Sequence, residues 1–138
     1  MTNTTNFNPP LPVAREHVTY NPNPSHKGRR LERLAEDMYA CRDAAADPQT
    51  PHGTLAKLAW DEDDVVRCNV AANIHTPPEV LGRLAEDDDM NVRLIVAHNL
   101  HTPPEVLAKL ADDEGVLLRW YVAHNPSTPP EVLGRLAA

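Results

Sequence analysis

The feature that most restricts the fold of this chain is a hexapeptide that recurs at a fixed interval. Thr-Pro-Pro-Glu-Val-Leu occurs three times, 26 residues apart, beginning at Thr76, Thr102 and Thr128. Partial copies precede these, one from Thr50 and a shortened one from Leu31. A unit this short cannot bury its own apolar face, so neighbouring units must stack. We therefore expect a solenoid of about four and a half repeats over residues 29–138.

Each repeat has the pattern of two short helices, so the predicted fold class is all-α. The first, helix A, should begin at the hexapeptide, with Thr76 as N-cap, proline in the first turn and Glu79 completing a capping box. An acidic segment follows in each full unit and should supply caps and favourable charge for the second helix, helix B. Helix B is expected over Val66–Asn73 and its equivalents, with the asparagine as a left-handed C-cap before the next proline pair.

Residues 118–137 read Leu-Arg-x-x-Val-Ala-x-Asn-Pro-x-Thr-Pro-Pro-Glu-Val-Leu-x-x-Leu-Ala, and this pattern resembles the leucine-rich repeat variant family. The resemblance implies a right-handed α-solenoid in which α-helices alternate with shorter 3₁₀-like turns. The 26-residue period is slightly longer than the family's usual repeat, which leaves room for a fuller second helix and is similar to a minimal HEAT repeat. Founding members carry a cysteine-rich iron–sulfur segment, whereas this chain has only Cys41 and Cys68, so we expect no cofactor.

Three arginines recur on helix B, each six residues after an aspartate. The pairs are Asp61 and Arg67, Asp87 and Arg93, and Asp113 and Arg119. HEAT-like arrays use a similar spacing to tie helix B to the loop of a neighbouring unit. The arginines could form a stripe that binds anions, or an internal ladder that fixes how the units stack. Because every arginine comes with a carboxylate of its own, we favour the structural ladder.

Helix A carries a basic stripe, which consists of Lys57, Arg83, Lys109 and Arg135 and is extended by Arg33. Such a stripe could contact the phosphates of a nucleic acid. Glutamates lie four residues before the last three cations, the favourable order for ion pairs within a helix: Glu79, Glu105 and Glu131. The formal net charge is −7, which also disfavours nucleic acid. We therefore predict a paired, solvated face and keep a nucleic-acid-associated or regulatory protein as the alternative function.

Comparison of the units singles out the outward side of helix B. The side equivalent to Val66, Arg67, Val70 and Ala71 keeps its character, whereas the opposite side changes from unit to unit. That side becomes more apolar and aromatic toward the C-terminus, where it carries Leu94, Ile95, His98, Leu117, Trp120, Tyr121 and His124. A solvated face does not normally gather such side chains, and Trp and Tyr are favoured anchors of protein interfaces. We predict that these residues bind a protein partner.

The first 28 residues have a different composition. They are rich in Asn, Thr and Pro and lack a helical period, which predicts an extended arm over residues 1–28. The contacts of this arm are expected to come from its scattered apolar residues, including Phe7, Leu11, Val13 and Tyr20. The arm could cover the Trp120 face of its own solenoid or could bind a sister subunit, and both alternatives stay open.

Motifs for catalysis are missing from the sequence. It has no Gly-rich phosphate loop, no His-Glu-x-x-His pair and no nucleophile elbow, so we expect neither an enzyme nor a small-molecule substrate. Histidines recur at unit boundaries, but equivalent residues of stacked units lie about 10 Å apart, too far to share a metal ion. No membrane-spanning window and no secretory signal is visible. We expect a protein-interaction or assembly module, cytoplasmic or part of a larger complex such as a bacteriophage virion.

Overall fold

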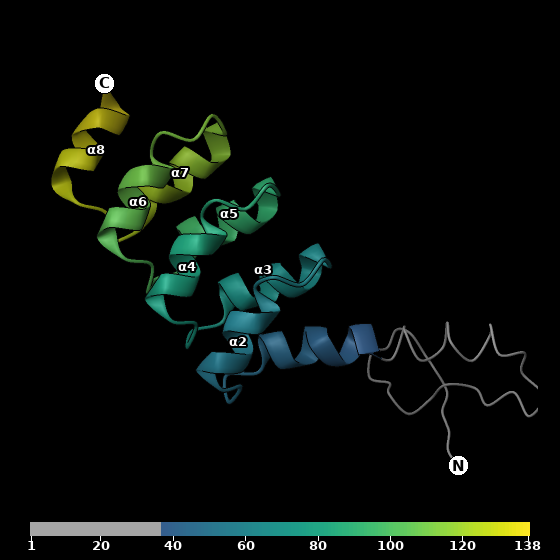
Figure 1. Ribbon diagram of the computed structural model, residues 1–138. Coiled ribbons are helices and arrows are strands. Elements are labelled where there is room, and N and C mark those ends of the chain that lie inside the picture. Colours follow the sequence, from purple (N-terminus) through teal and green to yellow (C-terminus); the bar gives the residue numbers. More distant parts are fainter. Residues whose placement is uncertain (1–36) are drawn as a thin grey trace, which may run out of the picture. The chain divides into compact units, whose positions relative to one another are not determined.

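A computed structural model of the chain describes residues 37–138 (Figure 1). The predicted arm over residues 1–28 lies outside the described part, as do Arg33 and the arm residues Phe7, Leu11, Val13 and Tyr20. The chain divides into two units, residues 1–44 and residues 45–138. Residues 37–46 are helical. The account below concerns residues 45–138, which contain the repeats.

All regular structure in the described part of the chain is helical. The helices that follow residue 46 are α2 (His52–Leu58), α3 (Asp64–Ala72), α4 (Pro78–Leu84), α5 (Met90–His98), α6 (Pro104–Leu110), α7 (Val116–His124) and α8 (Pro130–Ala137). The predicted all-α class is therefore confirmed. Both helices of each repeat are α-helices, so the 3₁₀-like turns implied by the family resemblance are not found among them. The 26-residue period provides the room for the fuller second helix.

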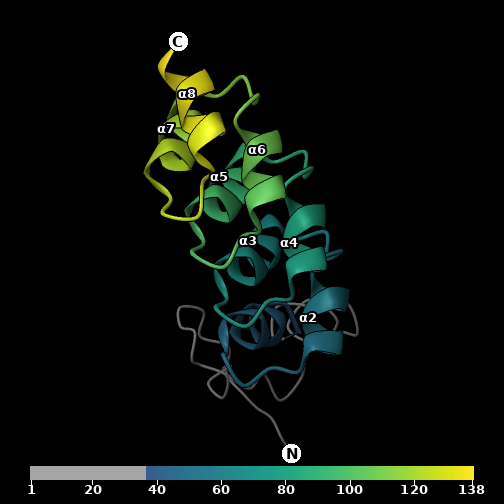
Figure 2. The same ribbon diagram turned by 90° about the vertical axis from the view of Figure 1, so that its left-hand side faces the viewer.

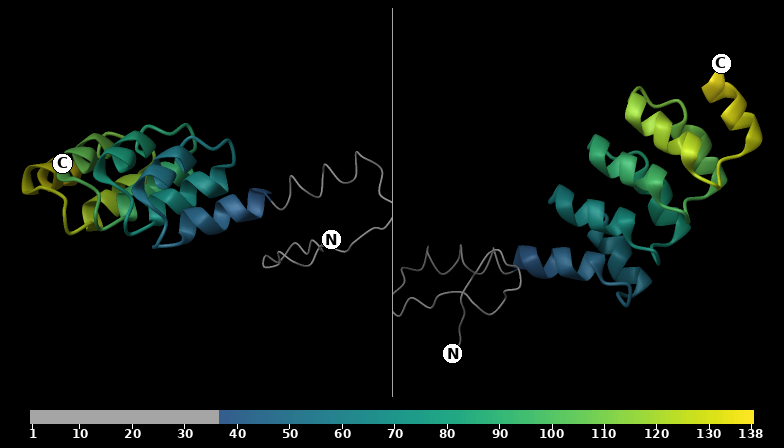
Figure 3. Two further views of the ribbon diagram at one scale, coloured as in Figure 1. Left: turned by 60° about the horizontal axis from the view of Figure 1, so that its bottom comes forward. Right: turned by 180° about the vertical axis from the view of Figure 1, so that it is seen from behind.

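The helices form two rows (Figure 2). Helices α2, α4, α6 and α8 are the A helices, and α3, α5 and α7 are the B helices. The B helices pack on one another, α3 on α5 and α5 on α7, and the A helices pack on the B helices next to them in the chain. The view from behind shows the same stepwise order from α2 to α8 (Figure 3). Residues 52–137 thus form a solenoid of two-helix repeats, as the period predicted.

The core lies between the two rows. The B helix α5 buries Val92, Val96 and Ala97 completely, and the equivalent residues of α3 are buried to the same extent. The A helices contribute Leu81 and Leu107, which are also fully buried. A seven- to nine-residue helix is too short to be stable by itself in water, so this burial between units is what holds the helices together.

The B helices begin two residues earlier than predicted, because the acidic loop caps them there. Asp63 is the N-cap of α3 and accepts a hydrogen bond from the Val65 N–H at 3.0 Å. Asp89 caps α5 in the same way, accepting from the Asn91 N–H at 2.7 Å. The third B helix has Gly115 at this position and lacks a side-chain cap.

The predicted start of helix A is wrong in detail. The N-cap of α4 is Pro77, no side chain caps the helix, and Thr76 and Glu79 form no capping box. The Thr76 hydroxyl instead donates to the Val70 carbonyl near the end of α3, at 2.6 Å. Proline at the first helical position lacks an N–H, so this end has fewer donors that need a cap. The threonine therefore closes the preceding helix rather than opening the next one.

Candidate protein interaction surface

The predicted contact residues lie on the outward side of α5 and α7, and we call them together the α5–α7 surface. They are Leu94, Ile95, His98, Leu117, Trp120, Tyr121 and His124. All of them are exposed or half-buried. Leu117 keeps 54 % and Trp120 keeps 52 % of its surface exposed. Within residues 45–138, about half of the surface of these two side chains therefore remains uncovered.

Four rings of the α5–α7 surface form a connected cluster. His98 of α5 meets Tyr121 of α7 edge to face, with ring centroids 5.3 Å apart, and Tyr121 meets Trp120 in the same way at 5.2 Å. The Trp120 ring stacks on His124 at 3.9 Å. The Nδ1 atom of His124 lies 2.8 Å from the carbonyl oxygen of Trp120. These contacts restrain the rings before any partner arrives, which lowers the entropy lost when an interface forms.

The same side of α3 has a different character. Cys68, Asn69 and Ala72 occupy the positions that Leu94, Ile95 and His98 occupy on α5. Burial raises the pKa of the Cys68 thiol, and the charges of nearby aspartates raise it further. The thiol is therefore protonated at neutral pH, which does not suit a nucleophile.

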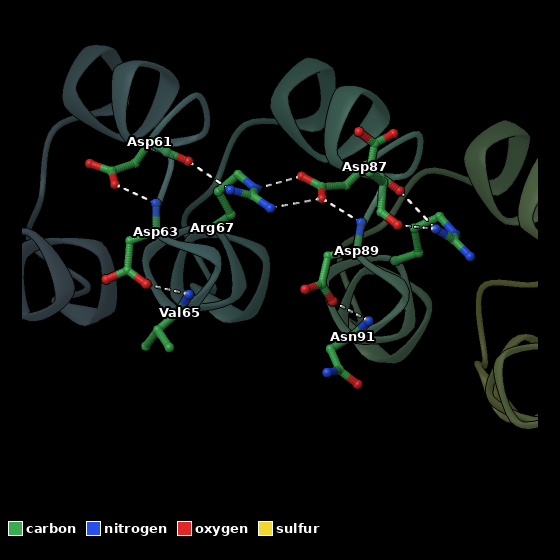
Figure 4. Close-up of polar contacts among 9 residues, drawn as sticks. Asp61, Asp63, Val65, Arg67, Asp87, Asp89 and Asn91 are labelled. Carbon is green, nitrogen blue, oxygen red and sulfur yellow. Dashed lines mark hydrogen bonds and ion pairs between the residues drawn. The ribbon is translucent and has the colours of Figure 1, made fainter.

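Arginines and aspartates form a ladder between successive loops (Figure 4). The Nε atom of Arg67 donates to the Asp87 carboxylate at 2.7 Å, and its Nη2 atom donates to the other oxygen at 3.2 Å. Its Nη1 atom donates to the backbone oxygen of Asp61 at 2.8 Å. Arg93 repeats this arrangement with the Asp113 carboxylate and the Asp87 carbonyl, both at 2.8 Å. Each of these arginines thus joins the loop of its own unit to the loop of the next.

The carboxylates of the ladder come from the next unit. The predicted role, a ladder that ties helix B to the loop of a neighbouring unit, agrees with these contacts, but the aspartate six residues before each arginine gives that arginine its backbone carbonyl oxygen and not its carboxylate. The carboxylate of Asp87 faces the arginine of the preceding unit and also accepts from the Asp89 N–H at 2.9 Å. Arg119 donates to the Asp113 carbonyl at 2.7 Å. No carboxylate of residues 37–138 forms an ion pair with Arg119.

The ladder keeps its members charged. Burial by itself would raise the pKa of the Asp113 carboxyl, but hydrogen bonds from Arg93 and the Gly115 N–H, with the charges of Arg93 and Arg119, hold this pKa below its usual range. The hydrogen bond to Asp87 is the main cause that raises the pKa of Arg67. The ion pairs therefore persist at neutral pH, and the arginines of α3 and α5 are not available to an external anion.

A second set of contacts between units was not predicted. Asn99 is buried, and its Nδ2 atom donates to the carbonyls of Ala71 at 2.7 Å and Asn73 at 3.4 Å in the preceding unit. Its Oδ1 atom accepts from the His101 N–H at 2.8 Å. Asn73 and Asn125 make the equivalent bonds in their own units. Their recurrence every 26 residues was the signal that could have revealed this role.

The left-handed C-cap predicted for these asparagines is wrong. At Asn99 the backbone has φ −67° and ψ 126°, which is extended, and Asn73 and Asn125 are extended as well. The extended backbone leads the chain out of helix B, and the side chain rather than the local turn fixes the position of the residue. The asparagine therefore acts across the junction between two units.

Two cations of the helix A basic stripe, Lys109 and Arg135, form ion pairs between units and not within a helix as predicted. The Nζ atom of Lys109 lies 4.0 Å from a carboxylate oxygen of Glu86, and the Nη1 atom of Arg135 lies 3.1 Å from one of Asp112. These partners come from the loop of the preceding unit, because the end of each A helix lies beside that loop. Such exposed pairs contribute about 0–1 kcal/mol each. They also place negative charge beside the cations that the nucleic-acid alternative would need.

The histidines do not gather into a metal site. In residues 37–138 no three or more His, Cys, Asp or Glu side chains are placed to hold a metal ion. His75 faces the Pro48 carbonyl, with its Nδ1 atom 2.8 Å from that oxygen. In the same part of the chain no helix has the length and apolar character needed to cross a membrane.

Comparison with known protein families gives a match inside the array. The leucine rich repeat variant family matches residues 65–89 and residues 91–115, which are two adjacent repeats. Each matched stretch runs from a B helix to the acidic loop of the next unit. No curated protein and no solved structure matches the chain significantly.

Proposed function

We propose that this chain, which contains leucine rich repeat variant repeats, is a non-catalytic module that binds a protein partner through its α5–α7 surface. Repeats of this family suggest a module for protein–protein interaction. One observation carries the proposal: a restrained cluster of Trp120, Tyr121, His98 and His124 stands on the outside of the array beside exposed Leu117.

The energetics favour this interpretation over a role in the core. Half of Trp120 remains exposed, so the solenoid gains only part of the burial that the ring offers. A partner that covers the rest would gain apolar contact at little entropic cost, because stacking on His124 already restrains the ring. The variation from α3 to α7 supports a role in binding, because α3 packs on α5 with Cys68, Asn69 and Ala72 at the equivalent positions.

Replacement of Trp120 by Ala tests the proposal. We expect partner affinity to fall by about 2 kcal/mol, roughly thirtyfold, because the ring is the largest anchor of the surface. The free energy of unfolding should change by less than about 1 kcal/mol, because the lost contacts are half solvated. Partners are captured from cell extract on the immobilised chain and identified by mass spectrometry, and their affinity is then measured by titration.

The control is Val65→Ala, which shortens an exposed apolar side chain on the equivalent side of α3. It should retain every partner that Trp120→Ala loses. Equal loss with both variants would contradict a specific α5–α7 interface. Unfolding of the array by Trp120→Ala would place the ring in the core and remove it from the surface.

A narrower form of the proposal makes the chain an assembly component, for example of a bacteriophage virion. Its support is the combination of a small repeat array with the Asn- and Pro-rich sequence of residues 1–28. The test is the mass in solution, by light scattering, of the chain with and without residues 1–28. An oligomer that becomes a monomer on truncation supports linkage of subunits by the arm. A monomer in both cases contradicts it.

A further inference from the structure

The first unit differs from the next two at one loop position. Trp60 stands where the following repeats have Glu86 and Asp112. Each of those carboxylates forms an ion pair with the cation at the end of the next A helix. In the first unit the equivalent cation is Arg83, and its contact with Trp60 is a cation–π contact: the Cζ atom of Arg83 lies 3.1 Å from the centre of the indole ring. The indole thus holds a guanidinium at the position where the other units hold an ion pair.

Trp60 and Arg83 line a pocket of about 420 Å³ between the loop after α2 and the loop after α4. The lining also includes Arg67 and five acidic residues, Asp61, Glu62, Glu86, Asp87 and Asp88. Of the five acidic lining residues, Asp87 pairs with Arg67 and Glu86 pairs with Lys109, which leaves Asp61, Glu62 and Asp88 against the single charge of Arg83. The wall of the pocket carries excess negative charge.

The polar groups of Arg83 are not used inside the array. Its Nε atom is buried without a hydrogen-bond partner, and no carboxylate of residues 37–138 forms an ion pair with the guanidinium. The stack on Trp60 still leaves 74 % of that residue exposed. One pocket therefore combines hydrogen-bond donors, an exposed aromatic surface and several carboxylates.

We propose that this pocket binds an arginine side chain from a basic segment of a partner protein. A guanidinium is flat, so it can lie on an indole surface while its N–H groups donate in pairs to carboxylates. The contact of Arg83 with Trp60 shows that this ring receives a guanidinium. Backbone carbonyls of the same segment can accept from the outer nitrogens of Arg83. The pocket shares no residue with the α5–α7 surface, so this inference goes beyond the proposed function.

The test measures binding of a fluorescein-labelled peptide of alternating alanine and arginine to the full chain, by fluorescence anisotropy at about 0.15 M salt. The decisive variant is Trp60→Glu, which introduces the residue type found one period later at Glu86, so the array should fold. It removes the indole and adds a carboxylate to the pocket. We expect the affinity to fall about tenfold. Attraction by net charge alone would make this variant bind more tightly, and that result would overturn the proposal.

A matched pair of variants separates the pocket from the acidic surface in general. Glu62→Gln removes a carboxylate of the pocket, and Glu114→Gln removes the equivalent carboxylate two periods later, outside it. We expect about threefold weaker binding for Glu62→Gln and no change for Glu114→Gln. Equal weakening by both would overturn the proposal, and circular dichroism verifies that each variant is folded.

Two further measurements test whether the pocket prefers arginine to lysine and whether the peptide binds at this pocket. The same peptide with lysine in place of arginine should bind more weakly, because an ammonium group cannot stack as a plane. Equal affinity for the two peptides would overturn the choice of arginine. Trp120→Ala should leave binding of the arginine peptide unchanged, so failure of the α5–α7 interface and failure of this pocket give different results.

Discussion

Helices α3 and α7 are two copies of one element with the same inner side and different outer sides. Val66 and Val70 of α3 are fully buried, as are Leu118 and Val122 of α7. The outer side carries Cys68, Asn69 and Ala72 on α3 but Trp120, Tyr121 and His124 on α7. Residues that recur with the period make most contacts between units, whereas each proposed binding site centres on aromatic residues that depart from it, Trp60 in one and Trp120 with Tyr121 in the other. The comparison therefore separates positions that build the array from positions free to acquire function.

We expect the largest loss of stability when a recurring side chain that joins two repeat units is removed. Asn99→Ala deletes the amide that bonds two carbonyls of the preceding unit and one N–H of its own. These groups are buried, so we expect a loss of about 3 kcal/mol in the free energy of unfolding, measured in urea. Asn91→Ala, an exposed position on the same helix, is the control and should change stability by less than about 0.5 kcal/mol. Similar values for the two variants would show that the buried amide is not a structural tie.

Smaller losses of stability are expected for two arginines of the ladder, and they should differ from each other. The side chains of Arg93 and Asp113 are 17 % and 12 % exposed, so Arg93→Ala leaves a largely buried carboxylate without its partner. We expect a loss of about 2 kcal/mol in urea unfolding. Arg119→Ala breaks only a bond to a backbone carbonyl and should cost about 0.5–1 kcal/mol. Equal costs would mean that the carboxylate contributes little to the ladder.

The smallest expected effect is a change in how the free energy of unfolding depends on pH. The pKa of Asp113 is lowered in the folded chain, so its contribution is complete above the unfolded pKa of about 3.9 and is lost as pH falls through the lower folded pKa. The free energy of unfolding should therefore decline on acidification from about pH 5 to pH 2, and decline less in Asp113→Asn than in the original chain. Asp112→Asn, at the exposed neighbour, should follow the original chain closely. An identical decline for Asp113→Asn would refute the role of this carboxylate.

The fold was predictable because a period with helical patterning leaves few arrangements. Leu and Val recur at positions that form one face of each helix, and a unit of 26 residues can bury that face only against its neighbours. The acidic loops were also interpretable, because Asp63 and Asp89 cap the B helices as short acidic side chains do. Stacking and patterning are properties of every repeat, so each copy added weight to the same conclusion.

The partners of individual side chains were not predictable, and the reason lies in the period itself. Arg67 follows Asp61 by six residues and precedes Asp87 by 20, and both spacings recur through the chain. A periodic sequence therefore cannot say which unit supplies a contact. The same ambiguity led to the wrong partners for Lys109 and Arg135.

The sequence alone indicates one of the two candidate sites more clearly than the other. The outer side of α5 and α7 was visible because several neighbouring positions change character together. Trp60 was not singled out, because it is one residue ahead of an acidic run and its partner Arg83 lies 23 positions away. A search for single departures from the repeat would have found it.

The identity of the junctions makes the length of this array adjustable in whole periods. Removal of residues 77–102 would join Thr76 directly to Pro103 and restore the hexapeptide. Arg67 would then stand before Asp113 at the distance it now has from Asp87, and Asn125 would follow Ala71 as Asn99 does now. The junctions from α3 to α5 and from α5 to α7 both contain an Arg–Asp ion pair and an asparagine tie, so a whole period could be gained or lost between α3 and α7 without redesign of the remaining units.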